Sequence, residues 1–288
     1  MEKVIVKQDI YNEQGILLIA KDTEIELTEE RLYLLNKIGR AEELFKPVEN
    51  DTYEEPPPKV SNIEDQTKTI IEKRIKDITS LYTTIDLEVL QKSTDVINYI
   101  VYECKGEEWH RYIVLQHSYV DWLYEHAINT AIISYLIGNA LGYDEKRLHS
   151  LCLGAIFHDI GMTLLPKEIL DKPSKLTNVE YHIIKNHSEM GYALLSSFQI
   201  PEVSKQIILQ HHERLDGSGY PQRLKGDELL EESLIVMVAE YFDTATTQRS
   251  YKAAEKASNV LKRMDLAKNI LPNYIVKIMK EMLTEDLL

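Results

Sequence analysis

Five of the nine histidines in this 288-residue chain are spaced in a way that suggests a shared metal site. They are His126, His158, His187 and the adjacent pair His211 and His212, and Asp159 follows His158 directly. About one helix plus one loop separates each group from the next, so successive helices can bring one group each to a common centre. Imidazoles with a bridging carboxylate suit iron or manganese better than calcium or magnesium, which prefer oxygen ligands.

The setting of His158 and Asp159 favours a site over ordinary packing. A lone histidine is most often a partly buried side chain with a satisfied hydrogen bond. Here two polar residues follow the apolar stretch LHSLCLGAIF and precede Gly161. Burying both without a partner costs free energy, so we expect them to bind something. The other four histidines, His110, His117, His149 and His182, lack such a setting, and we expect them to be surface or packing residues.

The order of these motifs resembles the HD-GYP family of metal-dependent cyclic di-GMP phosphodiesterases. His126 is followed by HDIG at 158–161, then by His187, then by HHERLDGSGYP at 211–221. The resemblance covers about residues 117 to 260, and the last string is highly specific. It implies a mainly α-helical HD-type metallohydrolase domain, in which His158 and Asp159 are catalytic.

The resemblance also implies a ligand set. The matching positions are His126, His158, Asp159, His187, His211, His212 and Glu240, with Asp159 as the bridging carboxylate. Glu240 stands where the family has an aspartate, in the string VAEYFD. Trp122 stands where some members have a glutamate that holds a third metal. We therefore expect two transition-metal ions, iron or manganese.

Five further residues match substrate-binding positions of the family: Gly219, Tyr220, Pro221, Arg249 and Lys252. Glycine and proline permit a tight loop that presents Tyr220 outward, where its ring can stack on guanine. Arg249 is suited to bidentate phosphate contact, although an ordinary solvated basic pair is the alternative for Arg249 and Lys252. The expected reaction is hydrolysis of cyclic di-GMP to linear pGpG and onward to GMP, with a mixed cyclic dinucleotide as another candidate substrate.

Departures from the family pattern keep a second function open. Met162 replaces a lysine that resembles a phosphate-contacting cation, and Ser188 and Ser250 replace prolines. Loss of a transition-state contact costs several kcal/mol, so we expect reduced activity and expect Met162→Lys to raise turnover. The alternative is a weak or inactive module that binds metal and a cyclic dinucleotide or a partner protein, which Met162 and Glu240 favour. Another HD-type phosphohydrolase is disfavoured because the GYP string is intact.

The elements that position these residues are predicted to be helices. Apolar residues recur at helical spacing from Thr67 onward, and Arg74 interrupts the first stripe. Predicted helices include 67–83, 94–103, 119–141, 145–160, 177–197, 201–212, 230–247, 251–269 and 272–284.

The expected organisation has three parts. Residues 1–46 form a small β/α unit with strands at 4–6 and 15–20 and a helix starting after Thr28, which suggests regulation or dimerisation. Residues 47–66 form an acidic, proline-rich linker. Residues 67–288 form the helical domain, with lead-in helices over 67–116 and the catalytic core over 117–288.

Composition limits the classes of partner. The chain carries 33 basic and 47 acidic residues, for a net charge of -14, which disfavours binding to DNA and to anionic membranes. An anionic ligand therefore needs a local basic site. Two isolated cysteines fit a reducing compartment, and the longest apolar stretch is too short to cross a bilayer. We expect a cytoplasmic protein, with a homodimer or a signalling partner protein as further expectations.

Overall fold

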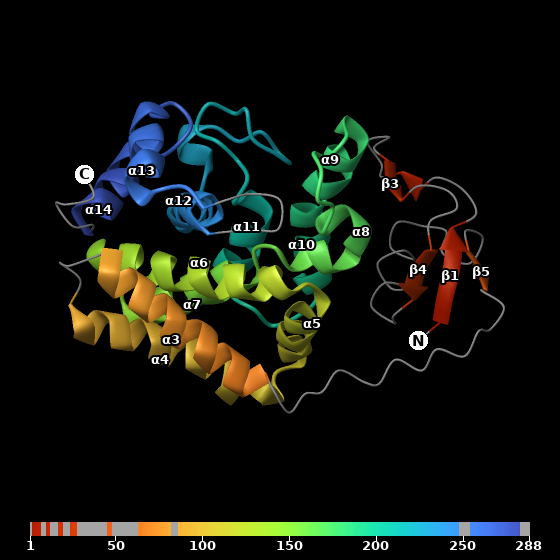
Figure 1. Ribbon diagram of the computed structural model, residues 1–288, viewed down its shortest axis with the longest axis horizontal. Helices are drawn as coiled ribbons and strands as arrows, with labels where there is room; N and C mark the ends of the chain where they lie inside the picture. The colour runs from red at the N-terminus through yellow and green to blue at the C-terminus, as the bar shows by residue number, and fades with distance from the viewer. Residues whose placement is uncertain are drawn as a thin grey trace.

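The computed structural model describes residues 2–6, 10–11, 17–19, 24–27, 45–47, 63–81, 86–247 and 254–282. From residue 63 onward the described chain is built of helices (Figure 1). The first group comprises α3 (Ile63–Leu81), α4 (Leu87–Tyr102), η2 (Glu103–Gly106), η3 (Glu108–His110), α5 (Arg111–Tyr119), α6 (Asp121–Ala140) and α7 (Glu145–Phe157). The second comprises η4 (Ile160–Leu164), α8 (Lys167–Leu170), α9 (Asn178–Lys185), α10 (His187–Leu195), α11 (Glu202–Gln210), η5 (Gly226–Glu228), α12 (Glu231–Thr246), α13 (Ala257–Leu266) and α14 (Asn273–Met282).

Short strands occur near the N-terminus. They are β1 (Glu2–Val6), β2 (Ile10–Tyr11), β3 (Leu17–Ile19), β4 (Glu24–Leu27) and β5 (Phe45–Pro47). β1 pairs antiparallel with β4 and β5, and β2 pairs antiparallel with β3. In the first pairing Val4 lies opposite Ile25. The helix predicted after Thr28 lies outside the described residues.

α6 is the central helix of the domain. It packs against α7 and α12, while α11 packs against α7 and α10. Its apolar residues include Leu123, Ile128, Ile132 and Ile137, each fully buried. A helix that is apolar on nearly all sides belongs in the interior, so α6 forms a scaffold for the helices around it. Among the described residues, no helix is both long and apolar enough to span a membrane.

Local capping explains two differences from the predicted helices. α4 begins at Leu87, well before the predicted start at residue 94, because the Asp86 carboxylate accepts a hydrogen bond from the Glu88 N–H. The single helix predicted over 177–197 is two helices, α9 and α10, separated at Asn186. The break lets α10 begin at His187 with a new axis.

Candidate metal centre

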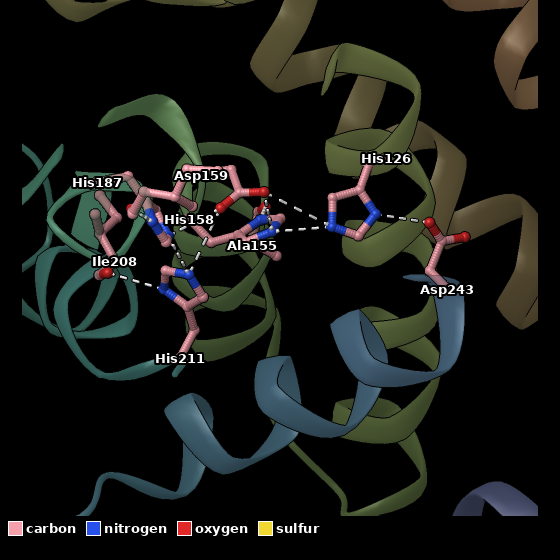
Figure 2. A network of polar contacts seen from close by, with 9 residues as sticks. His126, Ala155, His158, Asp159, His187, Ile208, His211 and Asp243 are labelled. Atoms are coloured by element: carbon pink, nitrogen blue, oxygen red, sulfur yellow. Dashed lines mark hydrogen bonds and ion pairs between the residues drawn. The ribbon is translucent and has the colours of Figure 1, made fainter. Parts of the chain in front are cut away.

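The five predicted histidines and Asp159 come together in two groups that share Asp159. Figure 2 shows how His126, His158, Asp159, His187 and His211 face one another. His126 lies on α6, His158 and Asp159 directly follow α7, His187 opens α10, and His211 and His212 directly follow α11. All of them except His212 are buried, with His158, His187 and His211 fully buried.

Three imidazoles are oriented by backbone carbonyl groups at the C-terminal ends of α7, α9 and α11. The Nδ1 atom of each lies within hydrogen-bond distance of a carbonyl oxygen three residues earlier. The pairs are His158 with Ala155 at 2.7 Å, His187 with Ile184 at 2.7 Å, and His211 with Ile208 at 2.9 Å. A carbonyl can only accept, so each Nδ1 donates its hydrogen and each Nε2 keeps a lone pair. These carbonyls are among those that a helix leaves unpaired at its C-terminus.

The Nε2 atoms face one another in pairs. His126 Nε2 lies 3.3 Å from His158 Nε2, and His187 Nε2 lies 3.0 Å from His211 Nε2. Two lone pairs at this separation repel unless a cation or a proton lies between them. The donor set therefore fits a transition metal, with the other ring nitrogen held by a second hydrogen bond, as is usual for metal-bound histidine.

Asp159 joins the two pairs. Its Oδ1 lies 3.1 Å from His187 Nε2 and its Oδ2 lies 3.4 Å from His158 Nε2. Two groups of residues have ligand atoms close enough for one ion each, and Asp159 belongs to both: His126, His158, Asp159 and Asp159, His187, His211, His212. One carboxylate with one oxygen towards each group is the arrangement that a bridging ligand requires.

Charge states in the cluster favour a cation. Burial alone raises the pKa of the Asp159 carboxyl, but His158 and the other imidazoles around it hold that pKa well below its usual range. Burial, together with the imidazoles next to it, lowers the pKa of His211 to about 3. Burial and His211 lower the pKa of His212 as well. A carboxylate and neutral imidazoles are the protonation states that bind metal. Burial lowers the pKa of His158, but the adjacent Asp159 raises it above its usual range, so His158 must release its proton when an ion binds.

The match to known families follows this geometry. A family model described as HD domain matches residues 114–270, more than half of the chain. The chain belongs to the HD domain family. This match confirms the predicted HD-type helical domain. Membership of the family implies a divalent metal, and the histidine cluster has side chains that could hold one.

Curated relatives of the HD domain carry phosphodiesterase names. The chain is 40% identical over 124 residues to the cyclic di-GMP phosphodiesterase response regulator RpfG of Xanthomonas campestris, covering 42% of this chain and 33% of that protein. It is 34% identical over 185 residues to a cyclic di-GMP phosphodiesterase of Thermotoga maritima, covering 64% of this chain and 45% of that protein. The chain thus spans less than half the length of these relatives. Their names agree with the predicted resemblance to HD-GYP proteins.

A solved structure supports the fold. Bd1817, an HDG"Y"P protein of Bdellovibrio bacteriovorus, aligns with a TM-score of 0.50 at 15% sequence identity. The alignment covers 97% of this chain and 93% of that one. At this identity the likeness shows a similar fold and no more.

Asp243 is a site residue that the sequence did not single out. Its Oδ2 accepts a hydrogen bond from His126 Nδ1 at 2.7 Å, and its Oδ1 lies 3.1 Å from Arg74 Nη2. Glu240, one turn earlier on α12, is not among the groups with clustered ligand atoms in the described chain. Its charge still acts on the cluster, because it contributes to raising the pKa of His158 against the opposing effect of burial.

Arg74 has a larger role than the sequence suggested. The interpretation that it only interrupts an apolar stripe is wrong, since its side chain is 6% exposed and pairs with the fully buried Asp243. An arginine within an apolar stripe was the available signal, because a buried guanidinium requires a carboxylate partner.

The loop of the GYP string is held by a buried carboxylate. Glu213 is fully buried and accepts hydrogen bonds from the N–H groups of Gln222, Arg223 and Leu224 at 2.6, 3.0 and 3.1 Å. A Cβ at Gly219 would lie 2.4 Å from the Glu213 Cα, so only glycine permits this approach.

Tyr220 turns inward from this loop, whereas the sequence suggested that it points outward. Its ring stacks on His212 with centroids 4.8 Å apart and is half-buried. Pro221 follows it directly. Burial raises the pKa of the Tyr220 phenol, which therefore stays un-ionised next to the cluster.

Two of the positions that depart from the family pattern, Met162 and Trp122, lie in apolar surroundings. Met162 is 8% exposed and packs in a cluster with Leu123, Leu165 and Ile183. Trp122 packs against the same cluster, and its Nε1–H donates to Asp171. Arg249 and Lys252 lie outside the described residues, as does Ser250.

Proposed function

We propose that this chain is a metal-dependent phosphodiesterase that hydrolyses cyclic di-GMP to linear pGpG and onward to GMP. The observation that carries the proposal is the buried carboxylate of Asp159 lying between two groups of imidazoles. Hydrolysis of a phosphodiester at neutral pH needs a strong nucleophile and neutralised phosphoryl oxygens. Two ions held a few ångströms apart supply both when bound.

The proposed ligands divide between two ions, iron or manganese. His126, His158 and Asp159 would hold the first, and Asp159, His187, His211 and His212 the second. Glu240 is proposed to complete the first set, which its electrostatic effect on His158 supports. Trp122 offers no carboxylate for a third ion.

The protein's own contribution is orientation and exclusion of water. Carbonyl oxygens fix the three imidazoles at the helix ends, and Asp243 fixes His126. Because these side chains are buried, their electrostatic interactions are screened less than at the surface. The centre is therefore organised before a substrate arrives.

Substrate contacts are proposed for the loop and for the segment after α12. Gly219, Tyr220 and Pro221 would line the dinucleotide site, and Arg249 and Lys252 would contact phosphate. The named activity of the two relatives supports cyclic di-GMP. Another relative, from Vibrio cholerae, is named a 3'3'-cGAMP-specific phosphodiesterase and is 35% identical over 129 residues, so a mixed cyclic dinucleotide is the second candidate.

The remaining proposals concern the whole protein. We propose a cytoplasmic enzyme with a regulatory or dimerisation unit over 1–46, a linker over 47–66 and the helical domain over 67–288. A homodimer and a signalling partner protein belong to the same proposal. The two isolated cysteines, Cys104 and Cys152, support the reducing compartment in this proposal.

A binding module without useful turnover is the second candidate function. Met162 favours it, because it places an apolar side chain where the resemblance expects a phosphate-contacting lysine. Glu240 favours it as well, since its carboxylate is not clustered with the other predicted ligands.

The test is anaerobic turnover of cyclic di-GMP by protein loaded separately with Fe(II) and Mn(II), with metal content assayed on the same samples. Asp159→Ala should lose both the metal and the activity. His182→Ala is the matched control, because His182 is exposed on α9 and lies outside the cluster. Two bound ions with dinucleotide binding but no cleavage would favour the binding module.

A further inference from the structure

An acidic protein that takes an anionic substrate needs cations at the site, and the described residues offer few. Met162 supplies none. Arg214, within the HHERLDGSGYP string, directs its Nη1 to the carbonyl oxygens of His211 and Glu213 at 3.3 and 2.7 Å. Its guanidinium therefore supports the backbone of the loop.

Lys185 is a cation at the edge of the centre that the family resemblance did not single out. It is the last residue of α9 and stands two residues before His187. Its Nζ lies 4.7 Å from the ring centroid of Tyr181 and 5.0 Å from that of Tyr220. The side chain is half-buried, and no carboxylate in the described part of the chain forms an ion pair with it.

The two aromatic rings hold the ammonium but leave its charge uncompensated. A cation over a ring face is attracted by the ring quadrupole, but the ring carries no net charge. By contrast, Lys172 in the same region places its Nζ 2.6 Å from the Glu180 carboxylate. A half-buried lysine whose ammonium contacts two aromatic rings is thus available to an anionic ligand.

The position of Lys185 relative to the histidines restricts which anion it can meet. The Tyr220 ring stacks on His212 and also contacts the Lys185 ammonium, so it lies between Lys185 and the histidine cluster. The ions proposed at the histidine cluster would neutralise the phosphodiester that binds there, so that group would not need Lys185. A cyclic dinucleotide carries a second phosphodiester on the other side of its ring.

We propose that Lys185 is a substrate-binding residue that contacts the second phosphodiester of the cyclic dinucleotide, the one that is not hydrolysed at the histidine cluster. This inference rests on the proposed function. It assigns to Lys185 the recognition of a cyclic dinucleotide over a simple phosphodiester, and gives the site a cation that Met162 does not provide.

The experiment compares two substrates on metal-loaded, full-length protein. Cyclic di-GMP has two phosphodiesters, whereas bis(p-nitrophenyl) phosphate has one. Lys185→Gln is expected to raise the KM for cyclic di-GMP about tenfold, the size of one lost hydrogen bond to a charged group. Its kcat/KM for bis(p-nitrophenyl) phosphate should stay within about twofold of the wild-type value. Lys185→Arg should retain most of the affinity for cyclic di-GMP.

Lys277→Gln is the matched control. It removes the same charge from α14, where the side chain is 74% exposed. Equal losses on both substrates in Lys185→Gln would show that Lys185 only supports the Tyr220 loop, and would overturn the inference. An unchanged KM for cyclic di-GMP in Lys185→Gln would overturn it too. A wild-type protein that hydrolyses neither substrate would instead overturn the proposed function, and the inference with it.

Discussion

At the residue scale, Asp243 connects a buried cation to a predicted metal ligand. Its two oxygens face Arg74 Nη2 and His126 Nδ1. The charge of Asp243 compensates the guanidinium and fixes the imidazole so that Nε2 faces the cluster. Outer partners of this kind tune metal affinity by about 10–100-fold when they are removed.

Asp243→Asn should therefore weaken metal binding by about tenfold or more and lower the free energy of unfolding by about 3–5 kcal/mol, because Arg74 loses its counter-charge. Metal titration and urea unfolding measure the two effects. Asp265→Asn is the control, since Asp265 is 40% exposed and pairs with Lys280 at the surface. Adding Arg74→Met to Asp243→Asn should recover part of the stability, and an additive loss would contradict a direct charge pair.

Met162→Lys tests the departure from the family pattern. The structure adds a cost to the expected gain in turnover, because Met162 packs with Leu123, Leu165 and Ile183. A lysine ammonium at this position must leave these apolar surroundings to reach water. We therefore expect a loss of about 1–3 kcal/mol in the free energy of unfolding, measured with urea. Met162→Leu should cost less than about 1.5 kcal/mol. An unchanged or lower turnover of fully metallated Met162→Lys would refute the expected gain.

At the element scale, η4 lies very close to α10, and this contact positions His187 relative to His158 and Asp159. A Cβ at Gly161 would lie 1.9 Å from the His187 carbonyl oxygen. Gly161→Ala should push α10 away, cost about 3 kcal/mol or more and weaken metal binding, as measured by thermal unfolding and metal titration. Gly106→Ala is the control, since nothing lies within 4 Å of its added Cβ. Wild-type metal affinity in Gly161→Ala would contradict this account.

α9 begins with a capping box formed by Thr177 and Glu180, and the pKa of the Glu180 carboxyl is strongly lowered. Glu180 accepts from Lys172 and from the N–H of Thr177, and these bonds lower its pKa to about 2. A depressed carboxyl pKa contributes stability above the unfolded value near 4.3, and this stability is lost as the pH falls towards 2. Lys172→Met should raise the Glu180 pKa, which carboxyl NMR of ¹³C-labelled glutamate would detect. An unchanged titration midpoint would rule out Lys172 as the main cause.

Sequence patterns predicted most of the helices and the histidine cluster. They did not predict the break between α9 and α10 or the contact between α3 and α12. The spacing of His126, His158, His187 and His211 predicted one centre, because about one helix plus one loop separates each from the next. The break at Asn186 was missed, since the helical period continues through it. The role of Asp243 was also missed, because its partner Arg74 is distant in sequence and only packing brings α3 to α12.

At the scale of the whole molecule, the histidine cluster is a group of polar side chains inside the helical core. The two proposed ions together should link α6, α7, α10 and α11. A ligand that binds only the folded state stabilises it by about 2.7 kcal/mol at a free concentration of about 100 Kd. Metal loading should therefore raise the Tm by about 5–10 °C, and chelation should reverse the rise. Asp159→Ala should abolish it, whereas His182→Ala should leave it intact.

The same rise should depend on pH. Imidazoles must be neutral to bind metal, and those of the unfolded chain take up protons below about pH 6.5. That uptake lowers the Tm of metal-loaded and chelated protein alike, so it leaves their difference unchanged. Burial lowers the pKa of His158, but the adjacent Asp159 carboxylate outweighs burial and raises that pKa, so a proton on His158 competes with the metal in the folded state. This competition should reduce the metal-dependent shift in Tm as the pH falls below about 6. Calorimetry of metal-loaded and chelated protein between about pH 5 and 8 measures the difference. A shift that stays constant across this range would mean that the ion is not held by the histidines.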